Sequence, residues 1–228
     1  MEKLSLFLRL VRAFRKLKRK PGYWVTGWRL HRDGFDRLHG TDTSRLLETY
    51  TPEGKPVHRY ETASESAILS TLNSLPMELS DYTFIDLGCG KGKPLLIAAG
   101  YPFRRVIGVD ISARCLAIAR KNVSRCNLDN RITLIVGDAT EYVFPDGPLL
   151  VYLFNPFPGP IIEKVIGRLV QRLDETPDPI TIVYMHPVNV DLIEKTSQFE
   201  KVIELPGKEV NHERAILFRS RPRQTHAK

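Results

Sequence analysis

The most constraining feature of the chain is a glycine-rich turn that directly follows a short apolar run. The run TFIDL covers residues 83–87, and Gly88, Gly90 and Gly92 alternate with other residues after it. Glycine adopts left-handed backbone angles at little steric cost and lets a ligand approach the main chain closely. Pro94 suits the first position of a helix, where its missing N–H costs nothing. The stretch therefore predicts a strand, a ligand-binding turn and a helix.

An acid beside this turn indicates the chemistry of the ligand. The dinucleotide fingerprint G-x-G-x-x-G would require a glycine at position 93, where this chain has Lys93. Asp86 precedes the turn, and a buried carboxylate attracts an ammonium group but repels a pyrophosphate. We therefore expect a ligand that carries an amino group. A tight turn that only joins a strand to a helix is the alternative reading of the glycines.

The pattern D-L-G-x-G-x-G at residues 86–92 resembles the first motif of the class I S-adenosylmethionine-dependent methyltransferases. The resemblance is strong over residues 83–157, and residues 35–44 and 60–62 resemble a little-characterised bacterial group of these enzymes. Alternating strand and helix patterns predict a doubly wound α/β sheet. The resemblance implies a mostly parallel, seven-stranded Rossmann-like sheet, with helices on both faces and an antiparallel strand near the C-terminus. It also implies S-adenosyl-L-methionine as the methyl donor, held by Asp86 and the backbone of the three glycines.

A second predicted strand, residues 105–110, ends in Asp110 and is followed by Ile111. Asp110 stands about 20 residues after the turn, where nucleotide-binding α/β folds use a carboxylate to bind ribose hydroxyls. We therefore expect Asp110 and Ile111 at the ribose. The alternative is that Asp110 only begins the next helix, residues 113–126, with Ser112 as its N-cap.

A third predicted strand, residues 132–136, precedes Asp138 and Ala139. The resemblance implies that Asp138 meets the adenine amino group and that Ala139 is a neighbour of the adenine. The carboxyl ends of parallel strands meet at one edge of a sheet, where open α/β sheets bind their ligands. The acids at the first three strand ends are therefore expected in one cofactor site.

The fourth predicted strand, residues 149–154, leads into Asn155, Pro156 and Phe157. This sequence is similar to the N/D-P-P-Y/F motif of methyltransferases that act on amino nitrogens. The resemblance implies that Asn155 and Pro156 accept hydrogen bonds from the amine and that Phe157 lies beside them as part of the catalytic motif. Phe157 stands where the motif has its second proline, so a planar base is not indicated as the acceptor. A turn that only shapes the wall is the alternative.

A fifth predicted strand, residues 180–185, ends at His186 and Pro187. Histidine can accept a proton near neutral pH, but a histidine at a strand end before proline is also a common structural residue. The sequence leaves both roles of His186 open. Two closing strands are expected at residues 199–205 and 214–218.

The net charge of +8 is concentrated at the N-terminus. Residues 1–32 contain ten of the 34 Lys and Arg residues and one of the 26 acids, which leaves 24 basic and 25 acidic residues in the remainder. Residues 4–19 have apolar side chains at helical spacing between the basic ones, which predicts a basic amphipathic helix. This helix either contacts an anionic membrane or an acidic partner, or packs on the core.

The nearly neutral remainder favours a small molecule or a protein over nucleic acid as methyl acceptor.

The predicted organisation is a basic helix at residues 1–20, an aromatic-rich lid or substrate-entrance segment at 21–63, a methyltransferase domain at 64–220 and a tail at 221–228. Cys89, Cys115 and Cys126 show no paired spacing, and no apolar run reaches membrane-spanning length. We therefore expect no metal site and a cytoplasmic location, at the inner membrane face if the basic helix binds lipid. The alternative to an enzyme is a non-catalytic cofactor-binding or membrane-associated scaffold. The oligomeric state is left open.

Overall fold

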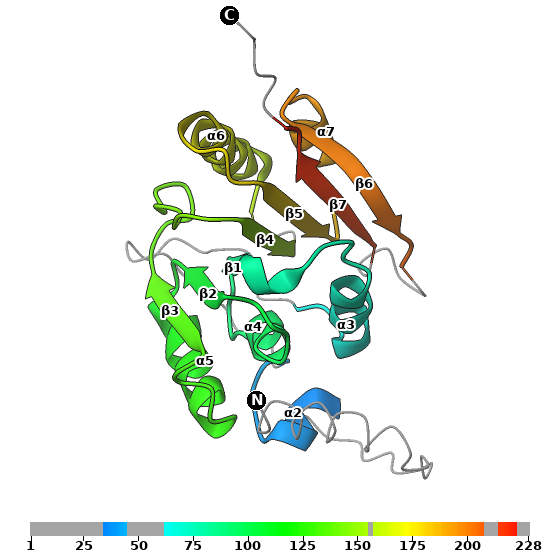
Figure 1. The fold of residues 1–228 in the computed structure, drawn as a ribbon. Helices are drawn as coiled ribbons and strands as arrows, with labels where there is room; N and C mark the ends of the chain where they lie inside the picture. Colours follow the sequence, from blue (N-terminus) through cyan, green and yellow to red (C-terminus); the bar gives the residue numbers. More distant parts are fainter. Residues whose placement is uncertain (1–33, 45–61, 155–156, 208–213, 223–228) are drawn as a thin grey trace, which may run out of the picture. The chain divides into compact units, whose positions relative to one another are not determined.

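The computed structural model describes residues 34–44, 62–154, 157–207 and 214–222 (Figure 1). Internal contacts divide the chain into residues 1–31 and 32–228, and every described residue belongs to the second unit. The predicted helix at residues 1–20, together with Asn155 and Pro156, lies outside the described residues.

The described part of the chain alternates strands with helices over most of its length. The elements in chain order are α2 (Gly34–His39), α3 (Glu65–Asn73), the 3₁₀ helix η2 (Leu79–Asp81), β1 (Thr83–Leu87), α4 (Lys93–Ala98), β2 (Arg105–Asp110), α5 (Ala113–Arg125), β3 (Ile132–Val136), β4 (Leu149–Phe154), α6 (Gly159–Glu175), β5 (Ile180–Met185), α7 (Val190–Glu194), β6 (Phe199–Leu205) and β7 (Ala215–Ser220). Strands β1 to β6 cover the residues that the apolar runs predict.

These strands form one seven-stranded mixed sheet in the order β3-β2-β1-β4-β5-β7-β6. Neighbours from β3 to β5 pair in parallel, whereas β7 runs antiparallel to both β5 and β6. The prediction of a mostly parallel sheet with a reversed strand near the C-terminus is confirmed. The parallel order brings the carboxyl ends of β3, β2, β1 and β4 to one edge (Figure 1).

Two buried clusters cover the two faces of the sheet. Leu150 and Tyr152 of β4 belong to the cluster that α3, α4 and α5 join. Val151 and Leu153 belong to the other cluster, which contains residues of α6 and α7. Strand β4 is therefore buried on both sides, as its uninterrupted apolar sequence predicts. Burial of this kind fixes the central strand ends that carry the candidate site.

Side-chain caps fix the starts of two helices. The Ser64 hydroxyl accepts a hydrogen bond from the N–H of Ala67 at 3.2 Å, and Ser112 accepts one from Cys115 at 3.2 Å. The two serines are the N-caps of α3 and α5, and Ser112 is the N-cap that the sequence suggests for its helix. One detail of the prediction is wrong: α4 begins at Lys93, so Pro94 takes the second helical position and not the first. Both positions lie in the first turn, where the missing N–H has no intrahelical partner.

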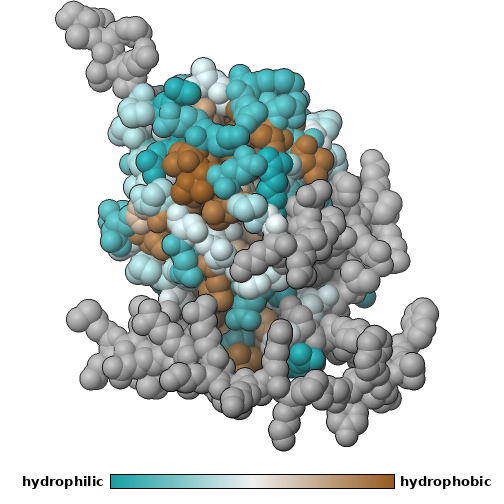
Figure 2. All heavy atoms as spheres, turned by 90° about the vertical axis from the view of Figure 1, so that its right-hand side faces the viewer, coloured by the Kyte–Doolittle hydropathy of each residue, from teal (hydrophilic) through white to brown (hydrophobic). Residues whose placement is uncertain are grey.

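The outer edge of the sheet at β6 is mixed in polarity. The charged residues Glu200, Lys201 and Glu204 are exposed there, and so is Val202. Figure 2, which faces the β6 side, shows apolar patches interrupted by hydrophilic groups. Charged side chains on an edge strand oppose pairing with another sheet.

Of the helices that the structure describes, none has both the length and the apolar composition needed to cross a bilayer.

Candidate functional site

The glycine-rich turn has the left-handed backbone that its sequence predicts. The φ angles of Gly88, Gly90 and Gly92 are 80°, 52° and 84°, which residues with a Cβ atom rarely adopt. The N–H groups of Gly88 and Cys89 both donate to the carbonyl of Val109, at 2.8 and 3.0 Å. The turn is thereby attached to the end of β2, and α4 begins directly after Gly92.

Asp86 lies in β1 just before the turn and is almost completely buried. Its side chain is 2% exposed, and its Oδ2 atom has no hydrogen-bond partner among the described residues. Burial raises the pKa of this carboxyl well above its ordinary value, and the negative charge of Asp110 raises it further. A buried carboxylate oxygen without a partner is costly for the folded protein. The residue is therefore suited to a cationic ligand, which would supply the missing partner.

Asp110 ends the neighbouring strand and holds two backbone groups. Its Oδ2 atom accepts a hydrogen bond from Gly90 at 2.7 Å, and its Oδ1 atom accepts one from Ser112 at 2.7 Å. Burial raises its pKa, and these two N–H groups oppose the rise. Asp110 thus connects the glycine-rich turn to the start of α5. Each carboxylate oxygen can accept more than one hydrogen bond, so these contacts leave capacity for ligand hydroxyls.

The remaining predicted cofactor residues lie near the ends of β2 and β3. In the register of these strands Asp110 is opposite Val136, the last residue of β3. Asp138 is exposed, and its Oδ1 atom accepts a hydrogen bond from Thr140 at 2.8 Å. Ala139 is buried against the cluster on the α6 face, and Ile111 is half-buried. The strand order therefore places Asp86, Asp110 and Asp138 on or just after three adjacent strands.

The residues predicted to hold the acceptor follow β4, which pairs with β1 on the side opposite β2. Phe154, the last residue of β4, has its ring centroid 6.1 Å from that of His186 at the end of β5. Phe157 is half-buried and packs against the cluster on the α6 face. His186 has a φ of 47°, and its N–H donates to the carbonyl of Arg214 at 2.8 Å. A positive φ is unusual for a residue other than glycine.

Residues 34–44 contribute a polar cluster that the sequence does not reveal. The Asp36 carboxylate accepts hydrogen bonds from the hydroxyls of Thr41 at 2.7 Å, Thr43 at 2.7 Å and Ser44 at 2.5 Å. Burial of Asp36 opposes ionisation, but these hydrogen bonds and the N–H of Thr43 lower its pKa to about 2. One ionised carboxylate therefore organises the turn that follows α2.

Gly108 is a second residue whose role was not predicted. A Cβ atom at this position would lie 2.3 Å from Cδ1 of Leu95 and 2.8 Å from Sγ of Cys89. Strand β2 can therefore approach α4 and the glycine-rich turn only because residue 108 has no side chain. A glycine inside an apolar strand is a sequence signal for such a close approach.

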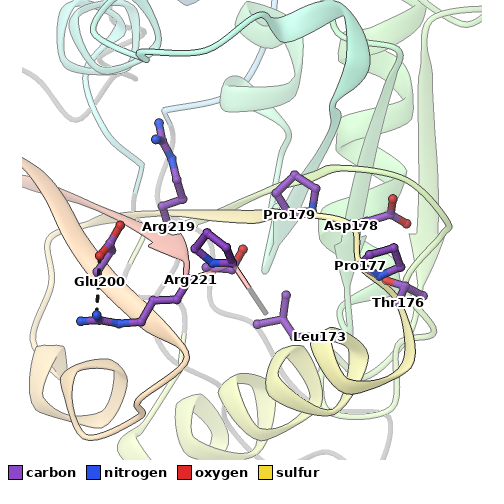
Figure 3. Close-up of a pocket in the computed structure, with 10 residues that line it drawn as sticks. Leu173, Thr176, Pro177, Asp178, Pro179, Glu200, Arg219 and Arg221 are labelled. Atoms are coloured by element: carbon purple, nitrogen blue, oxygen red, sulfur yellow. Dashed lines mark ion pairs between the residues drawn. The ribbon is translucent and has the colours of Figure 1, made fainter. Parts of the chain in front are cut away.

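A cavity of about 420 Å³ lies at the other end of the strands (Figure 3). Thr176 and Pro179, which line it, precede β5, whereas the candidate site lies at the carboxyl ends of the parallel strands. Arg221 and Glu200 form an ion pair of 3.8 Å at this cavity. The cavity is thus separate from the glycine-rich turn.

Among the described residues, no three His, Cys, Asp or Glu side chains are grouped to hold a metal ion.

Sequence comparisons find similarity between this chain and known methyltransferases. Residues 84–175 match the family model described as a methyltransferase domain. A release factor glutamine methyltransferase of Rhodopirellula baltica is 35% identical over 148 residues, which are 63% of this chain and 47% of the relative. An rRNA N(6)-adenosine-methyltransferase of Caenorhabditis elegans is 31% identical over 120 residues, 48% of this chain and 53% of the relative. The chain spans about half the length of these curated relatives.

Solved structures show the same fold at low sequence identity. A ribosomal protein L11 methylase of Lactobacillus delbrueckii has a TM-score of 0.50 and 17% identity, over 71% of this chain and 81% of that one. A precorrin-6y C5,15-methyltransferase of Geobacter metallireducens has a TM-score of 0.51 and 17% identity, over 71% of this chain and 90% of that one. The matched domain, the relatives and the Rossmann-like fold of these structures together support a class I S-adenosylmethionine-dependent methyltransferase.

Proposed function

We propose that this chain transfers a methyl group from S-adenosyl-L-methionine, bound at the glycine-rich turn, to an amino nitrogen of its acceptor. The observation that carries the proposal is the buried Oδ2 atom of Asp86, which lacks a hydrogen-bond partner among the described residues. The methionine part of this donor carries an ammonium group, which forms strong hydrogen bonds with carboxylates. Asp86 therefore fits the donor better than it fits a phosphate-bearing nucleotide.

The other binding residues are assigned along the strand ends in sheet order. The backbone of Gly88, Gly90 and Gly92 lies along the methionine part, because only residues without side chains leave room there. Asp110 and Ile111 bind the ribose, and Asp138 and Ala139 bind the adenine. Support for Asp110 comes from its two backbone hydrogen bonds, which orient its carboxylate without saturating its oxygens.

The residues of the site act by positioning and charge. When bound, the donor supplies a methyl group on a positively charged sulfonium, which a nitrogen lone pair can displace. A cation beside Asp86 favours the charged carboxylate, so the buried acid and the ligand stabilise each other. The apolar clusters beneath the strand ends exclude water from one side of the site. In-line displacement gains most of its rate from such fixed geometry.

The acceptor is proposed from this chain's own residues, because the relatives differ in what they act on. Their names specify a glutamine of a release factor and N(6) of an rRNA adenosine. Asn155 and Pro156 follow β4, next to β1 in the sheet, so their carbonyl groups are candidates to orient an amine beside the donor. Phe157, the next residue in the sequence, packs against the α6-face cluster. A small molecule or a protein remains the expected class of acceptor.

Transfer of tritium from labelled S-adenosylmethionine into a cell extract tests the proposed reaction. We expect the wild-type protein to label one of three fractions: small molecules, protein or RNA. Asn155→Ala should reduce the transfer about a hundredfold, since loss of acceptor positioning alone can cost that much. Asn130→Ala, at an exposed asparagine, is the matched control and should label as the wild type does.

Absence of transfer by the wild-type protein would contradict the proposal and favour a scaffold that binds the cofactor without turnover. Equal transfer by the wild type and Asn155→Ala would remove Asn155 from the acceptor site.

A further inference from the structure

Lys91 lies within the glycine-rich turn and is buried with its charge. The residue stands between Gly90 and Gly92, and its side chain is only 1% exposed. Its Nζ atom lies 3.2 Å from Oδ1 of Asp42, which comes from the turn after α2. Removal of the anionic partner would leave a buried ammonium group with one charge contact fewer, which is unfavourable in a protein interior. The glycine-rich turn is thus attached to a segment 49 residues earlier in the chain.

A single amide side chain reinforces this attachment. Asn122 of α5 is fully buried, and its Nδ2 atom donates to the carbonyls of Lys91 at 3.0 Å and Asp42 at 3.1 Å. Its Oδ1 atom accepts a hydrogen bond from the N–H of Asp42 at 2.9 Å. Asn122 therefore binds both the glycine-rich turn and the early segment. We call Asp42, Lys91 and Asn122 the turn clamp.

The turn clamp lies one residue away from a proposed ribose contact. The N–H of Gly90, directly before Lys91, donates to Oδ2 of Asp110 at 2.7 Å. Glycine has no strong backbone preference of its own, so Gly90 and Gly92 depend on outside contacts to hold their angles. Movement of Lys91 would therefore disturb the neighbouring hydrogen bond between the Gly90 N–H and Asp110. The clamp can therefore affect the cofactor site without contacting the cofactor itself.

Residues 34–44 form a stable base for this contact. The Asp36 carboxylate fixes the backbone of the segment through the N–H groups of Thr43 at 2.8 Å and Ser44 at 2.9 Å. The main chain of Asp42 lies within this fixed turn. Its carboxylate is consequently presented to Lys91 in a defined position.

We propose that the turn clamp is a positioning device for the cofactor site, in which residues 34–44 hold the glycine-rich turn in its binding conformation through the Lys91–Asp42 ion pair. The proposal rests on the proposed function, because it assigns the turn to S-adenosylmethionine. It adds that cofactor affinity depends on a segment that precedes the first strand. Asp42, Lys91 and Asn122 are positioning residues and not ligands.

The test titrates S-adenosylhomocysteine into four full-length proteins: the wild type, Asp42→Ala, Lys91→Met and the double variant. Asp42→Ala should weaken binding by at least about tenfold, because it leaves the Lys91 ammonium without this anion. The double variant should bind more tightly than Asp42→Ala, since neither charge is then left behind. Asp191→Ala breaks an exposed ion pair on α7 and is the matched control, with unchanged affinity expected. All titrations are run well below the unfolding temperature of each variant.

Hydrogen exchange of the ligand-free proteins provides a readout that needs no cofactor. The N–H groups of residues 88–92 should exchange several-fold faster in Asp42→Ala than in the wild type, while Asp191→Ala should leave them unchanged. Unchanged exchange in this turn would contradict the proposal that the turn clamp holds it in place. Faster exchange with unaltered affinity would also overturn its role in positioning.

If the wild type fails to bind S-adenosylhomocysteine, the proposed function and the positioning role both fail. The exchange result then decides separately whether the clamp holds the turn.

Discussion

Asp86→Asn should strongly weaken binding of S-adenosylmethionine while making the ligand-free protein more stable. The substitution removes the charge that pairs with the ligand's ammonium group, and loss of one partner of a buried charge pair costs about 2–5 kcal/mol of binding. This corresponds to an affinity loss of about thirtyfold or more. The ligand-free protein gains, because burial and the charge of Asp110 both disfavour a carboxylate at this position. We expect a gain of about 1 kcal/mol or more at neutral pH.

The stability gain of Asp86→Asn should depend on pH in a definite direction. The pKa of Asp86 is higher in the folded protein than its ordinary value of 3.8. At pH values between these two pKa values, the folded state therefore binds more protons than the unfolded state. The contribution of Asp86 to stability therefore falls as the pH rises through this window. Urea unfolding across this range measures it, and the gap between variant and wild type should widen with rising pH.

Asp146→Asn, at an exposed aspartate, is the matched control and should change neither binding nor stability. An Asp86→Asn protein that binds S-adenosylmethionine as the wild type does would refute the role of this carboxylate. A variant that is less stable than the wild type at neutral pH would refute the electrostatic explanation.

Gly108→Val should destabilise the fold by about 3 kcal/mol, because the added atoms overpack a filled interior. The first of these atoms would already lie 2.3 Å from Leu95 and 2.8 Å from Cys89. Valine favours strands, so intrinsic propensity predicts the opposite sign and the packing term must outweigh it. Thermal or urea unfolding of the ligand-free protein measures the effect.

Gly167→Val is the matched control for this prediction. A Cβ atom at Gly167 of α6 meets nothing within 4 Å, so the same substitution should change stability by less than about 0.5 kcal/mol. Since Cys89 lies in the glycine-rich turn, Gly108→Val should also weaken cofactor binding in the fraction that stays folded. Equal effects at the two glycines would show that close packing around β2 is not the reason for Gly108.

The strands could be predicted from the sequence because their signal is local. Buried parallel strands are near-continuous apolar runs, and the residues of β4 and β5 have this form. The caps Ser64 and Ser112 were predictable for the same reason, since a cap bonds to an N–H three residues later. The position of Asp86 before the glycines indicated a cationic ligand, and the structure adds that its Oδ2 atom is buried without a partner among the described residues.

The turn clamp could not be predicted, because its contacts join distant parts of the chain. Asp42 and Asn122 are 80 residues apart, and neither has a local pattern that indicates the other. Lys91 is a residue type that usually lies at the surface, and only tertiary contacts reveal that it is buried beside Asp42. The predicted helical position of Pro94 was wrong by one residue, because the N-cap of α4 is Gly92 and not Lys93.

Calorimetric titration of S-adenosylmethionine into the wild-type protein tests the central claim most directly. Experiments in two buffers of different ionisation enthalpy, at a mildly acidic pH, also count the protons exchanged. We expect one saturable site with a dissociation constant below about 1 mM, the upper end of ordinary enzyme affinities. Binding should release protons, because the ligand's ammonium group lowers the pKa of Asp86, and Asp86→Asn should remove this release. No saturable binding, or proton uptake on binding, would contradict a site for a cationic methyl donor at Asp86.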